Sequence, residues 1–290
     1  MSASQVPPGV ASEFVSRGHQ LAYTEFGEGK RWVLLMPGLL VPALMQEHLA
    51  MALATSGAHV LTLDPLGHGR SDRPGEMTEY SIESFAADAI ALLDHLDIDE
   101  AVVGGTSLGA NVTLEIAHAA PQRVRGMIIE MPVLENALVS SVIAFGPLLV
   151  ALHFGERLMR PLSAGLRRIP RPLVPFWGNV VLDVVRQEPR PSAALLRGLF
   201  FSHIAPYSAQ RREMTMPALV IGHHIDPVHP FSDAGVLTGE LPNARLVEAS
   251  NILELRFRPQ RLTAEIAAFV AECWSPKAVA KPRRQRRRTA

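Results

Sequence analysis

Short runs of apolar residues alternate with longer amphipathic stretches along most of this chain. The clearest runs are residues 31–36, 59–63, 101–103, 127–129 and 218–221. They are apolar at nearly every position, which is typical of parallel strands whose sheet is covered by helices on both faces. Residues 19–26 and 244–247 predict further strands nearer to the sheet edges. The pattern therefore predicts an α/β protein with a mostly parallel central sheet.

Between these runs, apolar residues recur at the three- and four-residue spacing of a helix. Residues 82–96 carry one such apolar stripe, with Ser81 as a suitable N-cap and Glu83 in the first turn. Another stripe follows Pro259, a residue type that is common at helix starts, and predicts the helix that closes the domain. Strand and helix thus alternate, as in an α/β fold.

The alternation stops in residues 132–216, which contain no convincing strand. This stretch is rich in Leu, Val, Phe, Pro and Arg and predicts several short helices separated by prolines. Because predicted strands flank it, we interpret it as a helical insertion. Residues 1–131 and 217–275 are then expected to form one core domain.

Composition favours a globular protein with a large core. Of the 290 residues, 48% are hydrophobic and 19% are charged, which excludes a disordered chain. The single cysteine, Cys273, excludes an internal disulfide and a cysteine-based metal site, and it fits a reducing compartment. No secretory signal pattern and no uninterrupted apolar run of membrane-spanning length is found in the sequence. We therefore expect a cytoplasmic protein with no membrane span.

The formal net charge is zero, with 28 basic and 28 acidic residues, but the charges are unevenly distributed. The last ten residues hold six basic side chains and no acidic one, so the first 280 carry 28 − 6 = 22 basic and 28 acidic residues, a net charge of −6. We interpret residues 276–290 as a basic, disordered tail that could touch anionic surfaces weakly. The tail has no aromatic residue for base stacking, so we expect no nucleic-acid partner.

The first indication of chemistry is Gly105-Thr106-Ser107-Leu108-Gly109, which lies between an apolar strand and an amphipathic helix. A serine on so sharp a strand-to-helix turn needs small neighbours, because larger side chains would clash there. The plain alternative is a glycine-rich turn whose serine only caps the following helix.

Three more motifs accompany the serine motif, each directly after a predicted strand. They are Met36-Pro37-Gly38-Leu39, the loop DPLGHGRSD at residues 64–72, and the loop GHHIDPVHP at residues 222–230. With these four motifs in order, the chain resembles the α/β-hydrolase fold superfamily, in particular its group of esterases, epoxide hydrolases and C–C hydrolases. The resemblance covers residues 19–131 and 217–272. It implies that the insertion at 132–216 is a helical lid between two strands.

The resemblance also implies a set of catalytic roles. Ser107 matches the nucleophile, Asp226 matches the triad carboxylate, and the backbone amides of Leu39 and Leu108 match the oxyanion hole. No cofactor and no metal site is implied. These roles are those of a serine hydrolase that forms an acyl-enzyme.

The general base is the departure from the family pattern. The family's histidine follows the last strand, but this sequence has Asn251 there, with Ser250 as the alternative, and no histidine occurs after His229. An asparagine side chain cannot take up a proton near neutral pH. His229, in the same loop as the acid, is our candidate base, and His223 and His68 are alternatives. Each of the three could instead be structural.

The insertion predicts a pocket for an apolar group. Phe145, Leu149 and Trp177 are the residues that we expect to contact substrate, although packing onto the core would also explain them. Glu130, at the end of a predicted strand, is expected to form hydrogen bonds beneath the lid, with a role as the triad carboxylate in place of Asp226 as the alternative.

The sequence thus predicts a hydrolase for an ester or related carbonyl substrate with a hydrophobic acyl part. The alternative is a catalytically silent protein of the same fold that binds a hydrophobic ligand or a partner, because the triad histidine is missing. The sequence assigns no oligomeric state.

Overall fold

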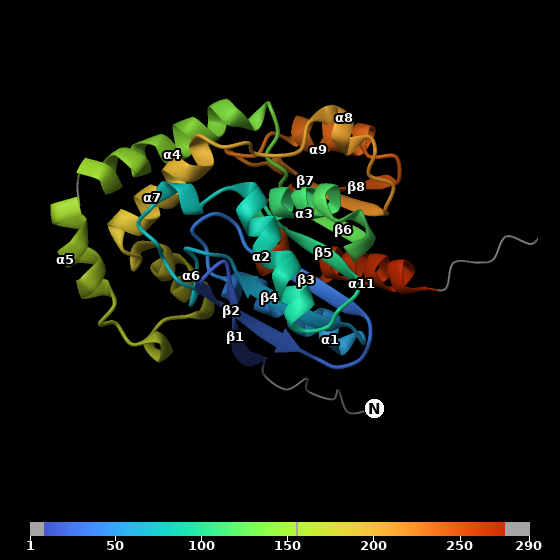
Figure 1. Ribbon diagram of the computed structural model, residues 1–290, viewed down its shortest axis with the longest axis horizontal. Helices are drawn as coiled ribbons and strands as arrows, with labels where there is room; N and C mark the ends of the chain where they lie inside the picture. The colour runs from blue at the N-terminus through green and yellow to red at the C-terminus, as the bar shows by residue number, and fades with distance from the viewer. Residues whose placement is uncertain (1–8, 155, 276–290) are drawn as a thin grey trace, which may run out of the picture.

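The computed structural model describes residues 9–154 and 156–275, and within them eight strands form a single sheet (Figure 1). The strands are β1 (Val10–Ser16), β2 (His19–Phe26), β3 (Trp32–Met36), β4 (His59–Asp64), β5 (Ala101–Thr106), β6 (Val124–Glu130), β7 (Ala218–Ile225) and β8 (Ala244–Asn251). Their order in the sheet is β1-β2-β4-β3-β5-β6-β7-β8. Pairing of β2 with β1 and β4 is antiparallel, and every other pairing is parallel. The predicted α/β class with a mostly parallel sheet is confirmed.

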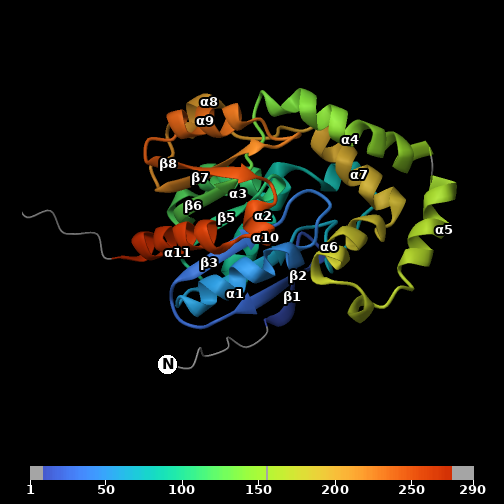
Figure 2. The ribbon, with the colours of Figure 1, turned by 180° about the vertical axis from the view of Figure 1, so that it is seen from behind.

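Helices cover both faces of this sheet, which explains why its inner strands are mostly apolar. One face is covered by α1 (Glu47–Thr55) and α11 (Gln260–Trp274), and the other by α2 (Ile82–His95), α3 (Leu108–Ala119) and α9 (Phe231–Glu240) (Figures 1 and 2). Alternate residues of one strand point to opposite faces. Accordingly, Leu34 of β3 belongs to the cluster under α2 and α3, whereas Val33 and Leu35 belong to the cluster under α1 and α11.

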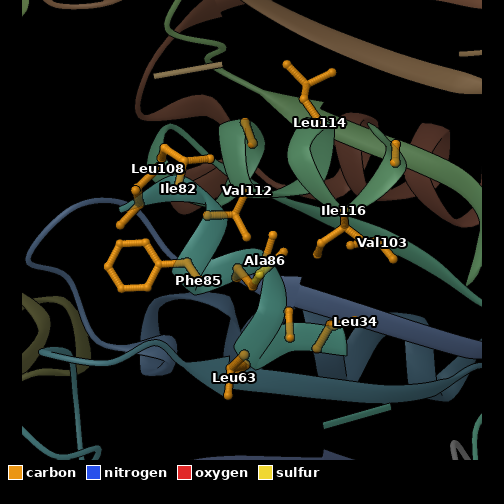
Figure 3. Close-up of a cluster of buried hydrophobic side chains, with 14 of the residues drawn as sticks. Leu34, Leu63, Ile82, Phe85, Ala86, Val103, Leu108, Val112, Leu114 and Ile116 are labelled. Carbon is orange, nitrogen blue, oxygen red and sulfur yellow. The ribbon is translucent and has the colours of Figure 1, made fainter. Parts of the chain in front are cut away.

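The larger cluster packs α3, and with it the end of the serine motif, against the sheet. Figure 3 shows Phe85 and Ala86 of α2 and Val112 of α3 gathered around this part of the core. Ser81 caps α2 by accepting a hydrogen bond from the Ser84 amide at 3.1 Å, as its sequence position predicts.

The sequence pattern did not predict β1, the antiparallel edge strand. It is joined to β2 by the two-residue turn Arg17-Gly18, in which φ is positive at both residues, as two-residue hairpin turns often require. Ser12, Glu13 and Ser16 of β1 are polar, so the strand lacks the continuous apolar pattern of the inner strands. An edge strand that contacts the core through few side chains gives only a weak sequence signal.

Between β6 and β7 the chain is helical. The helices are α4 (Ala137–Phe154), α5 (Glu156–Leu166), α6 (Phe176–Val185), α7 (Pro189–Phe200) and α8 (Ser208–Arg211). Both views of the molecule show α4 to α7 gathered on one side of the sheet (Figures 1 and 2). The expectation that prolines separate short helices is wrong at Pro147 and Pro161, which lie inside α4 and α5. The lost backbone hydrogen bond of Pro147 is tolerated because α4 packs along α7 and against the core.

Short helical turns complete the structure. They are η1 (Ala43–Gln46), η2 (Met77–Glu79), η3 (Pro121–Arg123), η4 (Arg171–Leu173) and the four-residue helix α10 (Glu254–Phe257).

Two core side chains hold the ends of the inserted segment. Asn111 of α3 donates to the carbonyls of Val133 and Ile204 at 2.8 and 2.6 Å, and its side-chain oxygen accepts from the Val133 amide at 3.0 Å. Asp233 of α9 accepts from the Leu134 amide at 2.9 Å. Because Asn111 follows Ser107 by one helical turn, the insertion is fastened beside the serine motif.

Within the described ranges, no helix is long and apolar enough to cross a membrane. The predicted basic tail, residues 276–290, lies outside the described residues.

Candidate active site

Ser107 stands on a strained turn between β5 and α3. Its φ is 54° and its ψ is −107°, a conformation that costs a residue with a side chain about 1–3 kcal/mol. The Ser107 amide donates to the Glu130 carbonyl at 2.9 Å, and the Ser107 carbonyl accepts from the Asn111 amide at 3.0 Å. These bonds to β6 and α3 hold the strained conformation in place.

The two glycines of the motif are required because α3 begins against the end of β3. A Cβ on Gly105 would lie 2.6 Å from the Met36 carbonyl oxygen, and a Cβ on Gly109 would lie 2.4 Å from the same atom. Real side chains do not approach backbone oxygens so closely, so both positions exclude any residue larger than glycine.

His229 lies between Ser107 and Asp226. Its Nε2 is 2.9 Å from Ser107 Oγ, and its Nδ1 is 2.8 Å from Asp226 Oδ2. Asp226 Oδ1 accepts from the backbone amides of Val228 and His229 at 2.8 and 2.9 Å. The structure therefore brings the three predicted catalytic residues together, with acid and base on the one loop that follows β7.

The surroundings of Asp226 favour its ionised form. Burial opposes ionisation, but the hydrogen bond and charge of the His229 ring, together with the two amides, outweigh it and hold the pKa of Asp226 below its usual value. We assign the Nδ1 proton of His229 to the bond with this carboxylate. Nε2 is then free to accept the Ser107 proton.

Two backbone amides are available beside Ser107. Leu108 is the first residue of α3, where amides have no partner within the helix. Gly38 packs close to the serine, since a Cβ built on it would lie 3.8 Å from the Ser107 Cβ, and Leu39 follows it. Within residues 9–154 and 156–275, the amides of Leu39 and Leu108 donate to no protein acceptor.

His68, the first alternative base, is engaged elsewhere. Its Nε2 accepts from the Leu40 amide at 3.0 Å and its Nδ1 lies 3.0 Å from the Leu66 carbonyl. The ring is fully buried, and burial lowers its pKa to about 4. His68 is therefore a neutral residue that links two loops.

His223, the second alternative, belongs to a buried charged cluster. Its Nδ1 bonds the Asn251 carbonyl at 2.8 Å, and its Nε2 is 3.3 Å from Glu130 Oε1 in a charge contact without hydrogen-bond geometry. Burial lowers the pKa of His223, but the neighbouring Glu130 carboxylate outweighs burial and raises it above its usual value. Both ring nitrogens of His223 thus face groups other than Ser107.

Glu130 is the centre of this cluster, beneath the serine turn. Glu130 Oε2 accepts from Thr106 Oγ1 at 2.5 Å and from Arg256 Nη2 at 2.6 Å. Burial opposes ionisation of Glu130, but Arg256, then His223 and Thr106, lower its pKa to about 2. The sequence did not predict the contact of Arg256 with Glu130. Arg256 lies in α10, which has only four residues, and no local sequence pattern pairs α10 with β6.

Asn251, the last residue of β8, stabilises a local turn. Its side-chain oxygen accepts from the Leu253 amide at 3.0 Å, and its carbonyl accepts from His223.

The predicted substrate contacts lie on two inserted helices. Phe145 and Leu149 of α4 are half-buried and pack against the larger core cluster. Trp177 of α6 joins an aromatic cluster, with ring centroids 5.0 Å from Phe176 and 5.6 Å from Phe257. Their role in binding substrate stays a prediction.

A cavity of about 820 Å³ lies elsewhere, where the sheet edge meets the insertion. Asp64, Arg73 and Gln187 line it, and its described lining contains no serine, cysteine or histidine. A cavity of this volume could hold a small molecule. Its described lining offers no serine–histidine pair, so Ser107 remains the candidate site for nucleophilic chemistry.

Comparisons with known proteins agree with this architecture. A family model described as alpha/beta hydrolase fold matches residues 31–151. The 3-oxoadipate enol-lactonase 2 of Acinetobacter baylyi is 25% identical over 265 residues, which cover 86% of this chain and 92% of that protein. Epoxide hydrolase A of Mycobacterium tuberculosis is 34% identical over 132 residues, which cover 45% of this chain and 41% of that protein.

This chain spans less than half of the length of several curated relatives that it matches. Among solved structures, the enol-lactonase from Burkholderia xenovorans LB400 superposes with a TM-score of 0.72 at 22% identity, covering 90% of this chain and 100% of that chain. The sheet order, the strained serine turn and the family model agree. The chain therefore has the α/β-hydrolase fold, and the family model of that name matches its residues 31–151.

Proposed function

We propose that this protein is a serine hydrolase that acts on an ester or related carbonyl substrate with a hydrophobic acyl part. The observation that carries the proposal is the 2.9 Å distance between His229 Nε2 and Ser107 Oγ, with Asp226 on the other ring nitrogen. This arrangement supplies a nucleophile, a base and an orienting carboxylate within hydrogen-bond reach. Relatives named as an enol-lactonase and an epoxide hydrolase support a hydrolase in general.

The proposed reaction begins with attack of Ser107 Oγ on the substrate carbonyl carbon. His229 Nε2 takes the serine proton, while Asp226 keeps the Nδ1 proton in place and stabilises the imidazolium. The amides of Leu39 and Leu108 donate to the oxygen that becomes negative. His229 then protonates the leaving oxygen, which departs as an alcohol and leaves the acyl group on Ser107.

Water completes the cycle. His229 removes a proton from a water molecule that attacks the acyl-enzyme. As the tetrahedral intermediate collapses, His229 returns this proton to Ser107 Oγ, which releases a carboxylic acid and free Ser107. The apolar side chains of the insertion, Phe145 and Leu149 on α4 and Trp177 on α6, would receive the acyl part.

The silent-protein alternative depended on a missing base. An imidazole within hydrogen-bond distance of Ser107, and a carboxylate whose pKa lies below its usual value behind it, support the enzyme instead.

Labelling with a fluorophosphonate tests the proposal. We expect the wild-type protein to be labelled between pH 6 and 9, no labelling of Ser107→Ala, and labelling of His229→Ala slowed at least about a thousandfold. His224→Ala is the matched control. His224 lies near the end of β7, five residues before His229, but it is exposed and pairs with Glu248 at 3.0 Å. A wild-type protein that resists labelling would contradict the proposed activity, and unchanged labelling of His229→Ala would contradict the proposed base.

A further inference from the structure

The turn that precedes η1, residues 38–41, is strained. The Val41 amide donates to the Gly38 carbonyl at 3.1 Å, and Leu40, the third residue of the turn, has a φ of 62°. Turns with positive φ at this position favour glycine, and a leucine there costs about 1–2 kcal/mol. Additional contacts must therefore hold this turn in its observed shape.

Two side chains from distant segments hold Leu40. Its amide donates to His68 Nε2 at 3.0 Å, and its carbonyl accepts from Gln187 Nε2 at 2.5 Å. His68 belongs to the core, whereas Gln187 lies between α6 and α7 in the inserted segment. The peptide groups on both sides of Leu40 are thus fixed, one by the core and the other by the insertion.

The amide group of Gln187 is itself oriented. Its Oε1 lies 3.2 Å from Arg73 Nη1 and 3.3 Å from Ser192 Oγ, both of which donate. Arg73 also donates to the carbonyls of Gly67 and Gly69 at 2.6 and 2.7 Å. With the oxygen of Gln187 held by donors, its nitrogen is left to face the Leu40 carbonyl.

We infer that Gln187 is a positioning residue for the reaction at Ser107. By holding the Leu40 carbonyl it keeps the 38–41 turn strained, and the turn in that shape points the Leu39 amide to the place where negative charge develops. The position of the inserted helices on the core thereby determines the geometry of the oxyanion hole. This inference rests on the proposed function, because the oxyanion hole has a purpose only if Ser107 attacks a carbonyl.

Three variants separate donation to Leu40 from packing of the insertion. Gln187→Ala removes both the donor and the contact with Arg73. Gln187→Glu keeps the length and can bond Arg73, but a carboxylate cannot donate to the Leu40 carbonyl. Glu188→Gln is the matched control, since Glu188 is the exposed neighbour of Gln187 and contacts Arg167 at 3.4 Å.

Kinetics with a chromogenic ester give the first readout. We expect Gln187→Ala and Gln187→Glu to lower kcat about 10- to 100-fold with KM changed less than about threefold, because a displaced oxyanion donor acts on the transition state. Glu188→Gln should match wild type. If Gln187 only docks the insertion, KM rises while kcat is kept, and Gln187→Glu behaves like wild type, which would overturn the inference.

Hydrogen exchange followed by mass spectrometry gives a readout that needs no activity. In both Gln187 variants, a peptide that contains residues 38–41 should exchange at least about tenfold faster, and a peptide that contains residues 105–109 should be unchanged. Unchanged exchange at 38–41 rejects the inference whether or not the protein is an enzyme. If exchange at 38–41 is faster but the wild-type protein resists fluorophosphonate, Gln187 does hold Leu40, but the proposed function is wrong. The positioning role of Gln187 in the reaction is then rejected with it.

Discussion

Asp226 and His229 lie three residues apart on one loop, and Asp226 Oδ2 bonds His229 Nδ1 at 2.8 Å. The other oxygen of the same carboxylate accepts the backbone amides of Val228 and His229. One short turn therefore sets the position of the Asp226 carboxylate, the orientation of the His229 ring and the conformation of the backbone between them. Ser107, the proposed nucleophile, comes from another part of the chain, the junction of β5 and α3.

Replacement of the acid tests how much depends on this turn. Asp226→Asn should slow fluorophosphonate labelling about 10³- to 10⁴-fold, because an amide stabilises neither the required tautomer nor the imidazolium. Glu248→Gln is the control, since Glu248 is exposed, contacts His224 at 3.0 Å and has no proposed catalytic role. Equal labelling of the Asp226→Asn and Glu248→Gln proteins would contradict the assignment of the acid.

The buried cluster around Glu130 predicts a loss of stability in acid. The pKa of Glu130 lies at about 2 in the folded chain against 4.5 for an unperturbed glutamate, so its stabilising effect is complete above pH 4.5 and is lost as the pH falls toward 2. Urea unfolding at stepwise lower pH measures the effect.

Glu130→Gln should remove this part of the pH dependence and lower the free energy of unfolding by about 3–5 kcal/mol, because Arg256 is left as a buried charge without its partner. Glu272→Gln, in the exposed pair with Arg245, should cost less than about 1 kcal/mol. Similar losses in the two variants would argue against a buried ionised Glu130.

His68 predicts a separate pH dependence. Burial lowers its pKa from 6.5 to about 4, so the neutral ring contributes stability above pH 6.5 that is lost as the pH falls toward 4. His68→Gln cannot take up a proton and should flatten the unfolding free energy in that window. A slope between pH 6.5 and 4 that persists in His68→Gln would show that other groups cause it.

Glycine replacements test the close approach of α3 to β3. Gly109→Ala should destabilise the protein by about 1–3 kcal/mol or more, because the new Cβ would lie 2.4 Å from the Met36 carbonyl oxygen. Gly235→Ala, in α9 with open space around the position, should leave the melting temperature unchanged or raise it slightly. Thermal unfolding of both variants under the same conditions measures the two melting temperatures. Equal melting temperatures would contradict the close approach of α3 to β3.

The half-buried side chain of Leu149 on α4 predicts a preference for substrates with long acyl chains. Leu149→Ala should lower kcat/KM for p-nitrophenyl esters with long acyl chains about 10-fold and change it little for the acetate ester, because the lost contacts are apolar. Val150→Ala is the neighbouring control, with 56% of Val150 exposed. A Leu149→Ala protein that lost activity equally on all chain lengths would point to a packing defect rather than a substrate contact.

Much of the fold could be predicted because its signals are local. Apolar runs at residues 32–36 and 101–103 mark inner strands, since burial on both faces favours apolar side chains. Ser107 could likewise be singled out, because a strained turn that packs against Met36 needs glycine two residues away on either side. The edge strand β1 escaped detection, since it contributes few buried side chains.

The sequence by itself determined the alternation of inner strands and helices, the place of the serine and the presence of an acid and a histidine in the loop after β7. It left three imidazoles as possible bases. Only the tertiary structure decided which of them meets Ser107, because that depends on which ring nitrogens are already bonded: both nitrogens of His68 are engaged, His223 faces Glu130, and His229 reaches Ser107 across 122 residues of sequence. The contact of Gln187 with Leu40 spans 147 residues. Such contacts leave no periodic pattern in the chain, because they are set by the packing of whole elements and not by local spacing.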